Sequence, residues 1–480
     1  MKYLHNVIDG KAAEPLDSTV FDVVNPFTEH VIARMPAGSA ADADAVVKSA
    51  RYAQEAWAAV DLEERLQYLS RTADVIDGHI RELAELESDE MGKPIPIAEQ
   101  FVTSGISALR SSVEQARKYP FVADVTAFGE PDRTIVTRRP LGVVALIIPW
   151  NFSVTSILAS IGPLLAAGNT VVIKPSEKAP LSAARLVELF DVPPGTVNLL
   201  HGDARAGRPL VEHEAVALVH FTGSVEAGRS VGVAAAKRLQ RSILELGGND
   251  PVIVDSDIDV VATAKAVAMS TFINSGQICT SSERIYVHRA IAKDFIDALV
   301  AETEAFAMID EPTGYGLGPL VDNAQREIVH THVLDAVAHG AKVLAGGQLP
   351  DRPGYFYPAT VLTDATSDMR IMNEETFGPV APITVVDSFE EAITLANGTG
   401  FGLACTVYSK SQENVALCAR INAAIVWINE WQSGGVGMTC EPWGLSGVGA
   451  TGGLASFDAA TRPCSMIYAS VTAPTVISDN

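Results

Sequence analysis

The sequence contains few cysteines, and those few form no recognisable pattern. There are five in 480 residues, an odd number, and no two of them are separated by only two residues. They are Cys279, Cys405, Cys418, Cys440 and Cys464. This pattern excludes a disulfide framework and a cysteine-based zinc site. It is typical of a reducing compartment, where a thiol nucleophile survives, and we therefore expect a cytoplasmic protein.

A long apolar run is also absent. The most apolar zone, residues 141–168, is interrupted by proline, asparagine, serine and threonine, whereas a membrane-spanning helix needs about 20 consecutive apolar residues. Residues 1–6 contain no apolar signal core. The ten histidines show no HExxH-type spacing. We therefore expect neither a membrane nor a metal ion as a partner.

Positive charge is scarce as well. Lysine and arginine number 35 against 58 aspartates and glutamates, which gives a net charge of −23. This charge argues against nucleic acid and anionic membranes as partners, and solubility is the simplest explanation of it. With 48% hydrophobic residues, the chain is long enough for more than one domain around a large core.

Predicted strands and helices alternate through most of the sequence. Continuous apolar stretches predict strands at 143–149, 170–174, 196–200, 217–222, 242–246, 252–254 and 284–287. Helical spacing predicts helices at 41–57, 62–80, 154–167, 181–190, 226–237, 260–272, 290–306 and 327–339. This alternation indicates an α/β fold with a parallel sheet covered on both faces.

One cysteine and one carboxylate together suggest covalent chemistry. Cys279 follows Gly276-Gln277-Ile278 in a small, polar setting, and Glu245 lies upstream within residues 244–249. A thiolate can add to an aldehyde carbonyl, hydride can then leave, and water activated by a carboxylate can cleave the thioester. A lone cysteine near glycine is also commonly a small buried hydrophobic residue. The pair favours catalysis.

The usual dinucleotide fingerprint, Gly-x-Gly-x-x-Gly, is missing from the first strand–helix turn. Two other segments can replace it. Glu177, just after the strand at 170–174, can accept hydrogen bonds from both ribose hydroxyls and repel a 2′-phosphate, which favours NAD over NADP. The alternative is a strand-end turn with an exposed charge. Residues 221–228 can present backbone N–H groups to a pyrophosphate, or they can form a close strand–helix contact that needs small residues.

These segments, in their order, resemble the aldehyde dehydrogenase superfamily over nearly the whole chain. The matching segments are Pro149-Trp150-Asn151-Phe152, residues 174–177, 221–228, 245–249 and 276–279, and Glu375-Thr376-Phe377-Gly378-Pro379. The resemblance implies that Cys279 is the nucleophile and Glu245 the general base. It also implies that Asn151, with the Cys279 backbone N–H, holds the oxyanion. Asn151 is alternatively placed to cap the following helix.

The resemblance also implies a set of cofactor contacts and a three-part architecture. The contacts are Pro149, Trp150, Lys174, Ser176, Glu177, Gly207, Gly223, Ser224, Gly228, Leu246, Glu375 and Phe377. A Rossmann-type NAD-binding domain is expected over 1–121 and 141–246, and an α/β catalytic domain over 247–445. A small β oligomerisation element and C-terminal tail are expected over 122–140 and 446–480, in a homodimer or homotetramer.

The sequence departs from the family pattern at two places. Ser153 stands where the family often has proline, and residues 442–447, in a loop that the resemblance places beside the substrate entrance, are shortened and lack the usual lysine. An entrance loop with aromatic and acidic residues suits an amino-aldehyde through cation–π contact, although these residues can equally well pack the loop. They are Glu430, Trp431, Glu441 and Trp443. The identity of the aldehyde is therefore left open.

The function expected from the sequence is NAD-dependent oxidation of an aldehyde to its carboxylic acid. Two alternatives stay open. One is a CoA-acylating relative, against which Glu245 argues because a base for water competes with thiolysis. The other is a non-catalytic protein of the same fold, against which the combination of Cys279, Glu245 and Asn151 argues.

Overall fold

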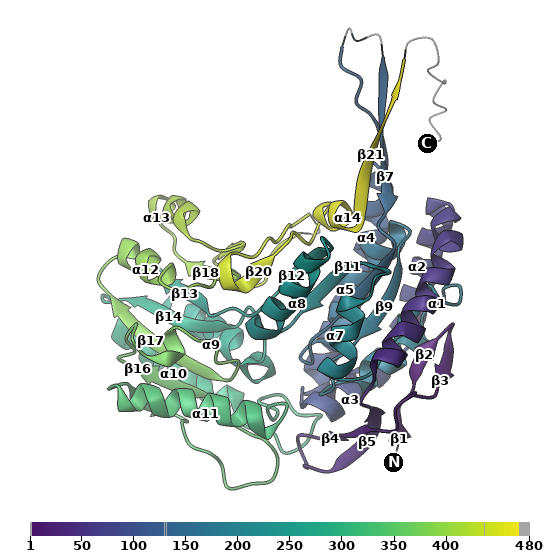
Figure 1. Ribbon diagram of the computed structural model, residues 1–480. Helices are drawn as coiled ribbons and strands as arrows, with labels where there is room; N and C mark the ends of the chain where they lie inside the picture. Colours follow the sequence, from purple (N-terminus) through teal and green to yellow (C-terminus); the bar gives the residue numbers. More distant parts are fainter. Residues whose placement is uncertain (1, 129, 131, 436, 470–480) are drawn as a thin grey trace.

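The computed structural model describes residues 2–128, 130, 132–435 and 437–469 (Figure 1). It contains two large sheets with helices on both faces, one in each half of the chain. The predicted α/β fold class is confirmed. Among the described residues, no helix combines the length and the apolar composition that crossing a membrane requires.

The first sheet has eight strands in the order β20-β12-β11-β8-β9-β10-β2-β3. The strands are β2 (Asn6–Ile8), β3 (Lys11–Ala13), β8 (Val143–Ile147), β9 (Thr170–Lys174), β10 (Val197–Leu199), β11 (Val216–Thr222), β12 (Arg241–Glu245) and β20 (Gly447–Val448). The five central strands run parallel, and the edge strands β20, β2 and β3 pair antiparallel. The carboxyl ends of β8, β9, β11 and β12 therefore share one edge.

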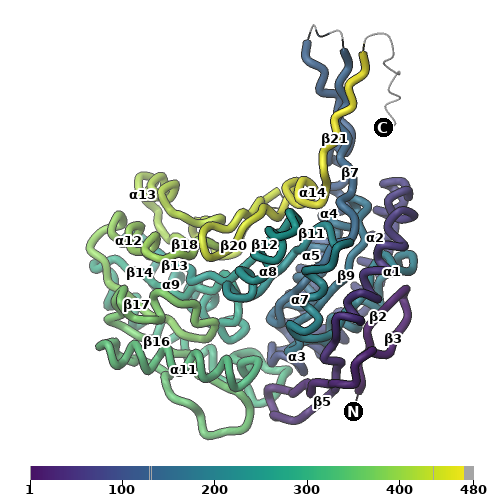
Figure 2. Tube along the Cα trace, viewed as in Figure 1, coloured from purple at the N-terminus to yellow at the C-terminus, as the bar shows by residue number. Residues whose placement is uncertain are grey.

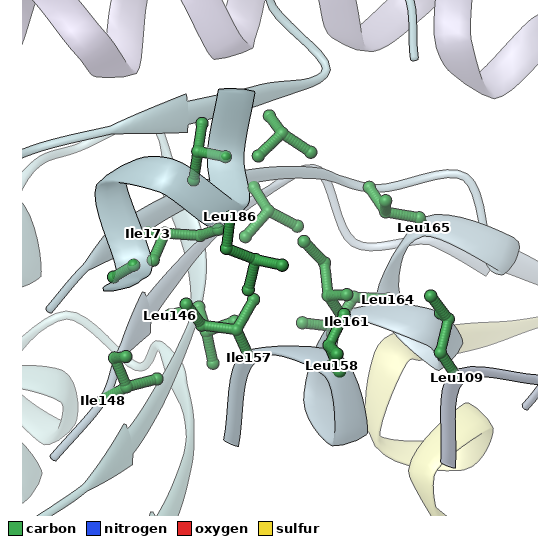
Figure 3. Packing of buried hydrophobic residues seen from close by; sticks show 14 of the residues in the cluster. Leu109, Leu146, Ile148, Ile157, Leu158, Ile161, Leu164, Leu165, Ile173 and Leu186 are labelled. Carbon is green, nitrogen blue, oxygen red and sulfur yellow. The ribbon is translucent and has the colours of Figure 1, made fainter. Parts of the chain in front are cut away.

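Alternate residues of these strands build two separate cores. Val144 and Leu146 of β8 face one core, and Val143, Ala145 and Ile147 face the other. Figure 3 shows the first of these cores, where Leu146 lies among side chains from several helices. Its helices are α2 (Leu62–Asp77), α3 (Ile80–Met91), α4 (Ile95–Lys118), α5 (Ser153–Ala166) and α6 (Leu181–Glu188). Helices α1 (Ala40–Ala59), α7 (Ala204–Glu212) and α8 (Val225–Lys237) cover the opposite core.

The second sheet has seven strands in the order β15-β16-β17-β14-β13-β18-β19. The strands are β13 (Asp250–Val254), β14 (Ser282–His288), β15 (Lys342–Ala345), β16 (Thr360–Thr363), β17 (Val380–Val386), β18 (Ala404–Tyr408) and β19 (Ile425–Ile428). Helices α9 (Val260–Phe272) and α10 (Ala292–Glu302) pack on one face. Helices α11 (Asn323–Ala338) and α12 (Phe389–Ala396) pack on the other.

Two small sheets complete the fold. One joins β1 (Lys2–Tyr3), β5 (Val31–Pro36) and β4 (Val20–Val24). The other joins β21 (Thr461–Tyr468), β7 (Arg133–Pro140) and β6 (Val122–Asp124), and it projects from the body as an arm (Figure 2). The short helices α13 (Gln412–Leu417) and α14 (Ala455–Ala460) lie before β19 and β21.

The predicted three-domain division stays a prediction. Of its last range, 446–480, residues 447–448 form β20 of the first sheet and residues 461–468 form β21 of the arm. Residues 470–480 lie outside the described part of the chain.

Two helical regions differ from the sequence prediction. The helix expected over 62–80 ends earlier than predicted, because α2 ends at Asp77 with Gly78 as its C-cap and a separate helix, α3, begins at Ile80. Helix α7 was not predicted, since Gly207 and Pro209 both disfavour a helix interior. Asp203 compensates at its N-cap, where the side chain accepts the backbone N–H of Arg205.

Candidate active site

The approach to Cys279 is a sharply turned segment after α9. Asn274 and Ser275 have φ values of 53° and 57°, and Gly276 has a φ of 72°. A Cβ atom on Gly276 would lie 2.2 Å from the carbonyl oxygen of Gly378, so only glycine fits. The chain can therefore turn back tightly, with Gly276 packed against the loop before β17.

Asn151 is tied to this segment. Its Nδ2 donates to the carbonyl oxygen of Gln277 at 3.0 Å, and Asn274 Nδ2 donates to the same oxygen at 3.1 Å. The Gln277 side chain is held in turn by the backbone N–H of Val321 at 2.9 Å. The N-cap of α5 is Phe152, without a side-chain cap, so Asn151 contacts the cysteine segment instead of capping the helix.

Several carboxyl groups surround Cys279, which is half-buried. Burial raises the pKa of its thiol, and the nearby carboxyl groups of Asp250, Glu375 and Glu245 raise it further. A negative thiolate is disfavoured by both effects. Both effects favour the protonated thiol, so formation of the thiolate requires a base or a positive charge.

Glu245 ends strand β12 and is placed by the strands on each side. Its register partners are Thr222 of β11 and Gly447 of β20. Burial raises its pKa to about 7, while a hydrogen bond from Thr451 opposes this shift. The Thr451 hydroxyl donates to Glu245 Oε1 at 2.8 Å. A carboxylate with a pKa near neutrality is suited to general-base catalysis.

The turn at Gly247 and Gly248 brings the acidic groups and the thiol segment together. The Gly248 N–H donates to Glu375 Oε1 at 2.9 Å. A Cβ atom on Gly248 would lie 2.5 Å from the Cys279 carbonyl oxygen and 2.6 Å from Asp250 Oδ1. Burial raises the pKa of Glu375 to about 8, with a further contribution from Glu283.

The predicted cofactor residues gather at the carboxyl ends of parallel strands. Residues 149–151 follow β8, residues 174–177 end β9, Gly223 and Ser224 follow β11, and Leu246 follows β12. Open α/β sheets bind nucleotides along this edge. Phe377 joins it from the second sheet, with its ring centroid 5.3 Å from that of Trp150.

The adenosine side of this edge is built around a buried lysine. Lys174 Nζ donates to the carbonyl oxygen of Pro175 at 2.9 Å. Burial lowers the pKa of Lys174, and Glu177 counteracts that shift. A Cβ atom on Gly207 would lie 3.3 Å from Lys174 Cε, so Gly207 leaves room for the lysine. Ser176 Oγ accepts the Lys178 backbone N–H.

The turn at 223–228 begins helix α8. The exposed Ser224 is the N-cap, and its Oγ accepts the Ala227 N–H at 3.3 Å. A Cβ atom on Gly228 would lie 2.3 Å from a methyl carbon of Leu246, which bears out a close contact that needs a small residue. The same helix start can also bind an anion, so the two interpretations of this turn are compatible. This helix start and the glutamate at 177 together fit a dinucleotide.

Of the predicted entrance residues, Trp431 is held beside the cysteine segment, and the other three are exposed. Trp431 Nε1 donates to the carbonyl oxygen of Thr280 at 2.9 Å, which places this residue beside Cys279. Trp443 is 56% exposed, and its backbone N–H bonds to Gly402. Glu430 and Glu441 are exposed.

Sequence reasoning missed two residues of the site, Thr451 and Glu283. Thr451 lies 206 positions from its partner Glu245, and Glu283 lies on β14 against the loop that holds Glu375. Both contacts depend on the tertiary fold. Among the residues that the structure describes, no group of three or more histidine, cysteine, aspartate or glutamate side chains is arranged to hold a metal ion.

The architecture and the sequence both match known proteins. Residues 13–465 match the model of the aldehyde dehydrogenase family. A mitochondrial aldehyde dehydrogenase of Leishmania tarentolae is 36% identical over 476 residues, which cover 97% of this chain and 94% of the relative.

Two solved structures have closely similar folds. The lactaldehyde dehydrogenase of Escherichia coli superposes with a TM-score of 0.94 at 34% identity, covering 97% of this chain and 99% of the other. The betaine aldehyde dehydrogenase of Staphylococcus aureus, solved in complex with NAD⁺, superposes with a TM-score of 0.93 at 28% identity, covering 99% and 96%. These matches confirm the predicted resemblance, and the chain belongs to the aldehyde dehydrogenase family.

Proposed function

We propose that this aldehyde dehydrogenase oxidises an aldehyde to its carboxylic acid with NAD, through a thioester on Cys279 that water then cleaves. One observation carries the proposal. The Gly247–Gly248 turn, separated from Glu245 only by Leu246, lies against the Cys279 segment, with the Gly248 Cβ position 2.5 Å from the Cys279 carbonyl oxygen. The base at the end of β12 and the nucleophile in the turn before β14 therefore lie close enough for Glu245 to affect the Cys279 thiol.

The residues divide the chemistry between them. Once a base has taken the thiol proton and released it to solvent, Cys279 adds to the aldehyde carbonyl as a thiolate, and the resulting oxyanion lies between its backbone N–H and the Asn151 amide. A primary amide has two N–H donors, and the bond to Gln277 uses one, so the other is available to the oxyanion. Bound NAD supplies the acceptor for the hydride that leaves the carbon.

Glu245 completes the turnover. With a pKa of about 7, it can take a proton from water at neutral pH, and the hydroxide equivalent attacks the thioester. Breaking the carbon–sulfur bond releases the acid and returns the thiolate to Cys279. A poised base for water supports hydrolysis over transfer to CoA.

The preference for NAD over NADP is part of the proposal and rests on Glu177. This carboxylate is partly exposed at the end of β9 and attracts Lys174. A carboxylate there can accept hydrogen bonds from free ribose hydroxyls and repels a 2′-phosphate. Lys174 softens this repulsion, so a preference is expected, without complete exclusion of NADP.

The proposal also includes the oligomeric state of the protein and its location in the cell. Apolar side chains are exposed on and beside the arm, namely Val122 at 59%, Val125 at 52% and Ile467 at 70%. Burial of such side chains against a second copy is favourable, which supports a homodimer or homotetramer. A cytoplasmic location is supported by the unpaired state of all five cysteines.

Steady-state assays with purified protein test the function. NADH formation is measured with a panel of hydroxy-, amino- and simple aldehydes, with and without CoA. Cys279→Ala should abolish NADH formation, while Cys464→Ala, a matched change on β21, should leave it within about twofold of wild type. Near-normal turnover by Cys279→Ala would contradict the covalent mechanism. Product released only in the presence of CoA would favour the acylating alternative.

A further inference from the structure

The segment of residues 374–377, called here the ribose loop, has an unusual backbone. It follows the short 3₁₀ turn Arg370–Met372 and leads towards β17. Phe377 has a φ of 53°, a left-handed conformation that bulky side chains rarely adopt. Such a conformation persists only where the surroundings enforce it, and it commonly marks a functional site.

The enforcing group is the carboxylate of Glu283. This side chain of β14 is 3% exposed. Its Oε1 accepts the Phe377 N–H at 2.7 Å, and its Oε2 accepts the Thr376 N–H at 3.0 Å. One carboxylate therefore binds two successive N–H groups of the ribose loop, which fixes the backbone where φ is positive.

Asn249 links this carboxylate to the turn that follows Glu245. Its Nδ2 donates to Glu283 Oε2 at 3.0 Å and to the Glu374 carbonyl oxygen at 3.2 Å. Both oxygens of Glu283 are thus occupied by three N–H donors. Burial raises the pKa of Glu283, and these bonds oppose that shift because three N–H donors stabilise the ionised carboxylate.

The opposite side of the ribose loop is held from helix α11. Gln325 Nε2 lies 3.1 Å from the carbonyl oxygens of both Thr376 and Phe377. His332 Nδ1 lies 3.2 Å from Thr376 Oγ1. Gln325 is only partly buried, so the outer side of the loop can be altered without disturbing the core.

We propose that Glu283 is a positioning residue, which sets the Glu375 carboxylate and the Phe377 ring for the nicotinamide riboside of the cofactor. The inference rests on the proposed function, because it assumes that Glu375 and Phe377 meet NAD. Glu375 lies between two residues whose backbone atoms are tied to Glu283 or Asn249. The Phe377 ring packs against Trp150 and is aimed by the backbone that Glu283 holds. Glu283 itself takes no part in bond making, since its oxygen atoms are already bound.

Glu283→Gln is the direct test. The glutamine has the same size, but its NH₂ group must face an N–H donor of the ribose loop or of Asn249. The dissociation constant for NAD, measured by titration calorimetry without aldehyde, should rise about tenfold, equivalent to about 1.4 kcal/mol. KM for NAD should rise by a similar factor, with a smaller change in kcat.

A reaction that needs no cofactor separates positioning from general damage. Hydrolysis of p-nitrophenyl acetate requires Cys279 and Glu245 but no NAD, and it should stay within about twofold of wild type in Glu283→Gln. An unchanged dissociation constant for NAD would overturn the proposal. A parallel loss of ester hydrolysis and NAD affinity would also overturn it, because Glu283 would then support the whole site.

Gln325→Ala tests the same loop if Glu283→Gln fails to fold. It should weaken NAD binding roughly threefold and leave ester hydrolysis unchanged. Gln240→Ala is the matched control. Gln240, just before β12, is also partly buried, and its side chain donates to the carbonyl oxygen of Val216 at the start of β11. Equal NAD affinity in both variants would contradict a role for the ribose loop. Wild-type protein that binds NAD but oxidises no aldehyde would overturn the proposed function and leave this binding test intact.

Discussion

Removal of the Thr451 hydroxyl should shift the pH dependence of thioester hydrolysis to higher pH. Thr451 donates to Glu245 Oε1 at 2.8 Å, and this bond lowers the pKa of a carboxyl group that burial raises to about 7. Glu245 acts as a base only when ionised, so the rate rises with pH through this pKa. Thr451→Val removes the donor, the pKa rises, and the acid limb of the profile moves upward.

The size of the shift follows from the strength of the bond. A hydrogen bond to a charged group contributes about 1.5–3 kcal/mol. Glu245 is only partly buried, so water replaces part of the lost bond and about half of that energy is expected. This corresponds to about 0.5–1 pKa unit. For a full unit, the ionised fraction at pH 6 falls from about 9% to about 1%, whereas at pH 9 the fraction hardly changes.

The assay is steady-state hydrolysis of an activated ester, a reaction whose rate is limited by deacylation. It is measured between roughly pH 5.5 and 9.5, a range that spans the Glu245 pKa. Thr451→Val should be about three- to tenfold slower than wild type at pH 6 and equal to it at pH 9. Thr451→Ser keeps the hydroxyl and should retain the wild-type profile. An acid limb that stays in place or moves to lower pH in Thr451→Val would refute the reasoning.

Two further predictions concern the base and the coenzyme. Glu245→Gln keeps the shape but cannot take a proton, so a burst of NADH should precede a steady state slowed by about 10²–10⁴-fold. An unchanged steady-state rate would remove Glu245 from the mechanism. Wild-type protein should have the higher kcat/KM with NAD, and Glu177→Gln should narrow the gap, mainly through a lower KM for NADP. A wild-type preference for NADP of about tenfold, or ~1.4 kcal/mol, would show that other contacts outweigh this carboxylate.

The sheet-forming parts of the fold could be predicted because their signals are local. The strand predicted at 170–174 matches β9, and the helix predicted at 260–272 matches α9. A continuous apolar strand and a capped helix carry their signals within a few residues. The end of α2 before Gly78 was missed although glycine is a local stop signal, and the helix α7 was missed because it forms despite Gly207 and Pro209, against local propensity.

The predicted site residues come from short sequence motifs. Such motifs predict the thiol and the base, and the structure places the strand ends that carry Asn151 and Lys174 at one edge of the sheet. Thr451 and Glu283 were not predicted, because a threonine in a glycine-rich stretch and a glutamate at a strand start are common everywhere. Their importance comes only from partners 206 and 93 positions away in the chain.

The glycines at 247 and 248 connect the local motif after Glu245 with the tertiary contacts of the site. A Cβ atom at Gly247 would lie 2.3 Å from Glu375 Oε2, and one at Gly248 would lie 2.5 Å from the Cys279 carbonyl oxygen. Neither glycine has a positive φ, so both are needed for space, not for backbone freedom. Alanine at Gly248 would push apart the carboxylate-bearing turn and the thiol segment through backbone atoms that cannot rotate away. The two glycines after Leu246 thus allow the end of β12, which carries Glu245, and the segment that carries Cys279 to approach each other closely, as the proposed mechanism requires.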